Sequence, residues 1–149
     1  MSSRPRAPLL GVDYGRRRTG FATSDPDGIL ASPSGFVTTR GLEDLAARVH
    51  EKAAAAGAAA IVLGDPRHAS GRPGDLSPEI EDLAERLRRR GWEVILWDEG
   101  LTSWEAQRRL DAAAPGSRRK ASRAKGETDA AAAAVLLQSY LDERARSRP

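Results

Sequence analysis

The chain has no cysteine, few aromatic residues and no long apolar run. The lack of cysteine excludes disulfide bonds and thiolate metal ligands. With only two Phe, two Tyr and three Trp, the core must be built from aliphatic and small side chains. No segment approaches the roughly 20 apolar residues that cross a bilayer, so no membrane partner is expected. The first residues also lack the apolar run of a signal peptide, which favours a cytoplasmic location.

The length and composition predict one folded domain. A chain of 149 residues suits a single hydrophobic core. Residues 1–8 are expected to form a disordered lead, and residues 9–145 the domain itself. The net charge of +3 is too small to indicate a nucleic-acid partner by itself, so the placement of the arginines matters more than their sum.

Short apolar runs and turn residues predict three antiparallel strands at the start of the domain. The segment 25–28, Asp-Pro-Asp-Gly, has the composition of a hairpin turn. Pro33 and Gly35 predict a break or bulge in the third strand. The three strands are expected at residues 9–14, 19–24 and 29–39.

Helical spacing of apolar residues then alternates with two further strand-like runs. Strands are predicted at 58–64 and 93–97, and helices at 42–57, around 80–87, at 102–112 and at 128–144. Residues 114–125 are polar and basic without periodicity, and are expected to form a flexible loop. Strands that follow helices imply right-handed crossovers. The predicted fold is therefore α/β, a ribonuclease H-like mixed five-stranded sheet, with three antiparallel strands followed by two parallel strands, flanked by helices.

Three acidic residues fall at positions where this fold would bring them together. Asp13 ends the first strand, Glu99 follows the fifth strand, and Asp129 opens the last predicted helix. Ligands in open α/β sheets bind beyond the carboxyl ends of the strands. Asp98 and Asp65 also follow strands and are possible additional ligands.

Carboxylates that converge in this way repel one another unless a cation lies between them. Hard oxygen ligands suit Mg²⁺ or Mn²⁺. Two such ions about 4 Å apart activate water and stabilise the leaving oxygen in phosphodiester cleavage. The pattern therefore favours a metal-dependent nuclease. Each acid also has a simpler interpretation, as a turn former, a surface residue or, for Asp129, a first-turn carboxylate stabilised by the helix dipole.

Four motifs in order resemble those of the YqgF (RuvX) family. They are Gly11-Val12-Asp13-Tyr14-Gly15 with Gly20, Ile61-Val62-Leu63-Gly64, Asp98-Glu99-Gly100-Leu101-Thr102-Ser103, and Lys125-Gly126-Glu127-Thr128-Asp129-Ala130-Ala131. The resemblance spans residues 9–141. The family comprises bacterial ribonuclease H-like proteins described as Holliday junction resolvases and as pre-16S rRNA nucleases.

The resemblance implies that Asp13, Glu99 and Asp129 are catalytic and bind metal. It also implies hydrolysis of phosphodiester bonds in structured RNA, namely precursor rRNA or ribosomal particles, or in branched or single-stranded DNA. The chain departs from the family pattern at Gly100, where arginine is common, and at Asp65, where leucine is common. Arg67 and Arg72 are candidates to replace that arginine.

Two basic segments flank the predicted site and suit a phosphate-binding rim. The predicted nucleic-acid-binding residues are Arg16, Arg17, Arg18, Arg67, Arg72, Arg118, Arg119, Lys120, Arg123 and Lys125. Each could instead be a solvated surface charge. With few aromatic residues to stack on bases, recognition by shape and backbone is expected.

The main functional hypothesis is a nuclease that processes the 5′ end of precursor 16S rRNA, as a monomer or homodimer. A Holliday junction resolvase or general DNA nuclease would use the same chemistry. A non-catalytic RNA-binding or transcription-associated factor is a third possibility. Asp13-x-Gly15 with Thr19-Gly20 also resembles the phosphate loop of actin-like ATPases and sugar kinases. Those enzymes need two such domains, and this length accommodates one.

Overall fold

The computed structural model describes residues 7–66, 74–98 and 121–147. Its sheet has five strands in the order β3-β2-β1-β4-β5. β1 pairs antiparallel with β2, and β2 antiparallel with β3, whereas β4 and β5 run parallel to β1. The strands are β1 (Leu9–Asp13), β2 (Arg18–Ser24), β3 (Ala31–Thr38), β4 (Ala60–Gly64) and β5 (Val94–Trp97). The predicted mixed sheet is confirmed.

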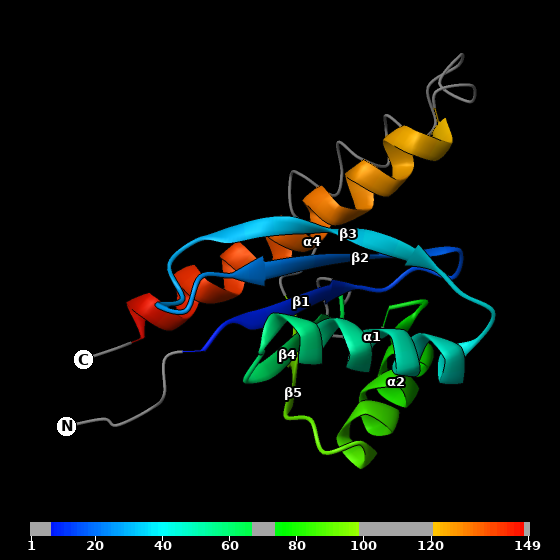
Figure 1. The fold of residues 1–149 in the computed structure, drawn as a ribbon, viewed down its shortest axis with the longest axis horizontal. Helices are drawn as coiled ribbons and strands as arrows, with labels where there is room; N and C mark the ends of the chain where they lie inside the picture. The colour runs from blue at the N-terminus through cyan, green and yellow to red at the C-terminus, as the bar shows by residue number, and fades with distance from the viewer. Residues whose placement is uncertain (1–6, 67–73, 99–120, 148–149) are drawn as a thin grey trace.

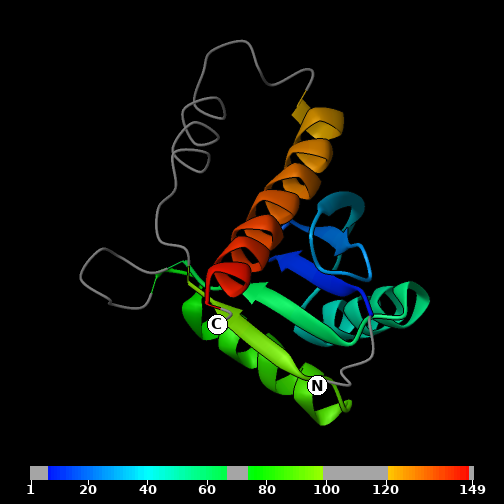
Figure 2. The ribbon, with the colours of Figure 1, turned by 90° about the vertical axis from the view of Figure 1, so that its left-hand side faces the viewer.

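Two helices cover one face of the sheet, as Figures 1 and 2 show. They are α1 (Leu42–Ala56) and α2 (Ser77–Arg89). Each buries an apolar stripe at helical spacing, with Leu45 and Val49 in α1 and Ile80 and Leu83 in α2. Gly57 ends α1 in a left-handed conformation that glycine adopts without strain. These stripes pack on the inner residues of β1, β2 and β4 to form the larger core cluster.

The opposite face is covered by α4 (Ala121–Arg146). Its contact face is made of small and aliphatic residues: Ala133, Leu137 and Leu141 are buried against Ala22 and Val62 of the sheet. Such short side chains let the helix lie close to the strands. Within the part of the chain that the structure describes, no helix is both long and apolar enough to cross a membrane.

The predicted bulge in β3 is confirmed. Gly20 pairs with Phe36 and Ala22 with Pro33, so three residue steps of β3 lie opposite two of β2. Gly35, within the extra length, has a φ of 87° that favours glycine. The strand is shorter than predicted, because residues 29 and 30 belong to the turn that Asp25 organises. The Asp25 carboxylate accepts hydrogen bonds from the backbone N–H groups of both residues.

The predicted start of the last helix is wrong. It begins at Ala121 rather than Thr128, so residues 121–125 of the expected flexible loop are helical. The segment lacks an apolar stripe, but alanine, arginine, lysine and glutamate have high helix propensity and no proline interrupts them. The predicted helix at 102–112 lies outside the described residues.

Candidate metal centre and nucleic-acid interface

The carboxyl ends of β1, β4 and β5 meet at one edge of the sheet because these strands are parallel. Asp13 is the last residue of β1, Asp65 directly follows β4, and Asp98 directly follows β5. Three acidic residues therefore end adjacent strands. Their side chains nevertheless have different surroundings, and only some of them face the same side of the sheet.

The Asp13 side chain belongs to the face covered by α4. Side chains alternate along a strand. Leu10 and Val12 belong to the core cluster with α1 and α2, whereas Leu9 packs in the cluster with α4. Asp13 is in phase with Leu9, and it is half-buried. The Asp13 carboxylate thus lies at the carboxyl end of β1, on the side of the sheet that α4 covers.

Gly20 brings Asp129 to the same place. Gly20, in β2, is the strand partner of Asp13 in β1. A Cβ at Gly20 would overlap the carbonyl oxygen of Asp129 and lie 2.8 Å from the backbone nitrogen of Ala130. The helix backbone therefore lies directly on the strand residue that neighbours Asp13. Asp13 and Asp129, which are 116 positions apart in the sequence, occupy one face of the sheet at one edge.

Asp129 lies eight positions after the start of α4, because that helix begins at Ala121. The dipole of a helix acts mainly on its first turn. The simpler interpretation of Asp129 as a first-turn carboxylate is therefore wrong. Its carboxylate is instead held by Arg18: the guanidinium Nε donates a hydrogen bond to Oδ2 at 3.1 Å.

Asp65 has a buried position, with 1% of its surface exposed. The hydroxyl of Ser77, the first residue of α2, donates a hydrogen bond of 2.6 Å to its carboxyl group. Its backbone N–H donates to the carbonyl of Trp97 at the end of β5. Asp65 thus links β4 to the start of α2 and to β5. Asp98 is exposed, and Glu99 lies outside the described residues.

The residues present fit a hard divalent cation as far as the structure describes them. Asp13 and Asp129 supply carboxylate oxygens, the ligands that Mg²⁺ and Mn²⁺ prefer. Among the described ranges, no group of three acidic or histidine side chains is gathered closely enough to hold a metal ion. Asp13 and Asp129 are two of the three predicted ligands, and the third, Glu99, lies outside the described residues.

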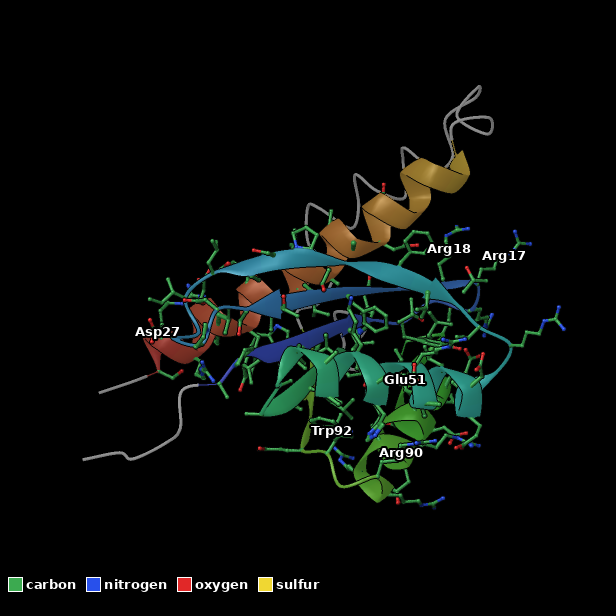
Figure 3. The ribbon with its side chains drawn as sticks, in the orientation of Figure 1. Arg17, Arg18, Asp27, Glu51, Arg90 and Trp92 are labelled. Carbon is green, nitrogen blue, oxygen red and sulfur yellow. The ribbon has the colours of Figure 1, made fainter. Side chains whose placement is uncertain are left out.

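The predicted basic rim is described only in part. Arg16 and Arg17 lie in the connection that follows Asp13, and Arg18 is the first residue of β2. Figure 3 shows Arg17 and Arg18 together at this end of the sheet. Arg17 is exposed, and it makes no ion pair with any described residue. Arg67, Arg72, Arg118, Arg119 and Lys120 lie outside the described residues, and the backbone of Arg123 and Lys125 is in α4.

Glu79, on the first turn of α2, was not predicted to belong to this edge. Its carboxylate accepts a 2.7 Å hydrogen bond from the Tyr14 hydroxyl and is paired with the Arg16 guanidinium at 2.8 Å. Arg16 is therefore partly neutralised. No local sequence signal predicts this cluster, because Glu79 is 65 positions from Tyr14. Burial, and then the hydrogen bond to Glu79, raise the pKa of Tyr14 to about 12.

Replacing Glu79 with glutamine is expected to lower the pKa of Tyr14, but not to its ordinary value of 10.0, because the burial remains. An ultraviolet titration of phenolate in a Tyr140→Phe background would follow Tyr14 alone. A raised pKa means that the neutral phenol stabilises the fold at pH below 10 and that this stabilisation is lost as pH rises towards 12. Glu85→Gln, on the same helix, is the control. An unchanged Tyr14 titration in Glu79→Gln would contradict this assignment.

The arrangement is a ribonuclease H-like fold, and solved resolvases share it. RuvC of Thermus thermophilus in complex with a Holliday junction superposes with a TM-score of 0.53 at 15% identity, covering 93% of this chain and 95% of that one. The Fowlpox virus resolvase with its Holliday junction DNA gives 0.52 at 11% identity, covering 91% and 97%. At such low identity these similarities concern the fold alone.

The sequence comparisons identify the family. The profile of the RuvX family, described as Holliday junction resolvase, matches residues 7–143, and the chain belongs to this family. A relative from Mycolicibacterium paratuberculosis, named "Putative pre-16S rRNA nuclease", is 43% identical over 145 residues, covering 93% of this chain and 82% of the relative. A relative of the same name from Mycobacterium tuberculosis strain H37Rv is 40% identical, covering 93% and 81%.

Proposed function

We propose that the protein is a divalent-metal-dependent nuclease that processes precursor 16S rRNA in the cytoplasm. The observation that carries this proposal is the contact of the Asp129 backbone with Gly20, the strand partner of Asp13. This contact puts two carboxylates from distant parts of the chain on one face at the carboxyl edge. The names of the relatives at 40–43% identity support the RNA substrate.

Asp13 and Asp129, with Glu99 as the third predicted ligand, would hold Mg²⁺ or Mn²⁺. The bound metal would activate water and stabilise the leaving oxygen during phosphodiester hydrolysis. The protein's own contribution is to position these ligands before substrate arrives: β1 holds Asp13, and the packing of α4 on Gly20 holds Asp129. Preorganised ligands avoid rearrangement during the reaction.

Substrate would approach over the β1–β2 connection. Exposed Arg17 is available to a phosphate there, and the predicted basic residues 118–120 precede α4 in the sequence. Phosphate contacts of this kind orient a nucleic acid without reading its bases. Binding is therefore expected to weaken as salt increases.

The test is cleavage of a precursor 16S RNA fragment and of a four-way DNA junction, each with Mg²⁺, with Mn²⁺ and with a chelator. The proposal predicts cleavage of the RNA that stops when the metal is chelated. Paired cuts in the junction alone would instead favour the resolvase activity that the family description names. That activity requires two sites and hence a dimer. Binding without cleavage of either substrate would favour a non-catalytic RNA-binding role.

A further inference from the structure

We propose that Arg18 is the counter-ion that a metal must displace from Asp129, and that it thereby sets the metal affinity of the site. This inference rests on the proposed function, because it concerns the same carboxylates. Arg18 is a positioning residue on this account. It acts on the metal only through Asp129.

The ion pair between Arg18 and Asp129 is one that a metal ion could replace. Arg18 Nε meets Asp129 Oδ2 at 3.1 Å, and the two side chains are 24% and 21% exposed. Water and ions therefore reach the pair. Arg16, by comparison, contacts both oxygens of Glu79, at 3.0 and 3.2 Å through Nε. Among the described residues, the Arg18 side chain makes one hydrogen-bonded ion pair, from Nε to Oδ2 of Asp129.

The charge of Arg18 stabilises the arrangement of Asp13 and Asp129. Two carboxylates at one edge repel each other, and a guanidinium beside one of them reduces that repulsion. A divalent cation bound to the same carboxylates would serve the same purpose with twice the charge. The two cations repel each other and compete for Asp129. Loading the metal must therefore weaken or break the Arg18 contact.

Removing the charge of Arg18 should then tighten metal binding. Arg18→Met keeps an apolar stem of similar length and removes the guanidinium. We expect its dissociation constant for Mn²⁺, measured by titration calorimetry without nucleic acid, to be lower than that of the wild type by about threefold or more, as for loss of a partly exposed ionic contact. Arg18→Lys, which keeps the charge, should remain close to the wild type.

Arg17→Met is the matched control, because Arg17 is adjacent and charged but makes no ion pair with the described residues. It should bind Mn²⁺ as the wild type does. Thermal unfolding gives the second readout. With chelator, Arg18→Met should unfold at a lower temperature than the wild type, and saturating Mn²⁺ should remove the difference.

The outcomes separate the two proposals. If the wild type binds Mn²⁺ and Asp129→Asn binds it more weakly, the metal site stands. Unchanged or weaker Mn²⁺ affinity in Arg18→Met would then overturn the role of Arg18 alone and leave it a structural ion pair. If the wild type and Asp129→Asn have the same Mn²⁺ affinity, or if the wild type binds none, the metal site itself is wrong, and the role of Arg18 is wrong with it.

Discussion

Replacing Gly20 with alanine is expected to destabilise the protein by about 3 kcal/mol or more, at or above the upper end of typical overpacking effects. The new Cβ would overlap the Asp129 carbonyl oxygen and lie 2.8 Å from the Ala130 nitrogen. These are backbone atoms of a long helix, so no rotamer change can relieve the overlap. Helix α4 would have to move away from the sheet, and Asp129 would move with it.

Chemical denaturation measures this effect directly, and Gly64→Ala is the matched control. Gly64 also faces α4, but its added Cβ would meet the δ-carbons of Leu136, at 2.8 and 3.1 Å. A leucine side chain can rotate away, so the control should lose less stability, about 1 kcal/mol. Equal losses in the two variants, or a change below about 0.5 kcal/mol in Gly20→Ala, would show that α4 is not seated as described.

The order of strands and helices could be predicted because local patterns determine it. The turn at residues 25–28 and the alternation of apolar runs with helical stripes were sufficient for a mixed sheet with three antiparallel strands. The bulge in β3 followed from Pro33 and Gly35. These signals act over a few residues and need no knowledge of distant contacts. The start of α4 could not be predicted from an apolar stripe, because residues 121–127 have none, although five of the seven are good helix formers.

The candidate site was predictable only as a set of positions. Strand ends place Asp13, Asp65 and Asp98 along one edge, but pattern alone does not say which side chains face α4. Asp65 shows the difference: it follows β4 as expected, yet its carboxyl group is buried against Ser77. Asp65 therefore links β4 to the start of α2.

The partners of the site residues could not be predicted, because they are distant in the sequence. Arg18 and Asp129 are 111 positions apart. Arg18 was predicted to bind nucleic acid, and the structure pairs it with the predicted metal ligand. An ion pair of this kind forms only when α4 packs closely on β2. This close packing is possible because glycine at position 20 has no side chain.

Asp13→Asn and Asp129→Asn are each expected to slow cleavage by about 10²- to 10³-fold. Each substitution replaces a charged ligand with a neutral amide and weakens the hold on the metal, whose contribution to the transition state is several kcal/mol. Both variants should still fold, because each amide has nearly the shape of the carboxylate. Asp129→Asn also loses the charge that pairs with Arg18.

Asp27→Asn is the control for a general effect of losing an acid. Asp27 is exposed in the turn before β3, at the end of the sheet opposite Arg17 and Arg18, as Figure 3 shows. It should cleave at the wild-type rate. Circular dichroism of all three variants would verify that the fold is retained.

The measurement that tests the central claim most directly is the single-turnover rate of cleavage of a precursor 16S RNA fragment in Mn²⁺. The four proteins compared are the wild type, Asp13→Asn, Asp129→Asn and Asp27→Asn. The account predicts cleavage by the wild type and Asp27→Asn and a loss of about 10²-fold or more in the other two. Cleavage by folded Asp13→Asn and Asp129→Asn at the wild-type rate would contradict it.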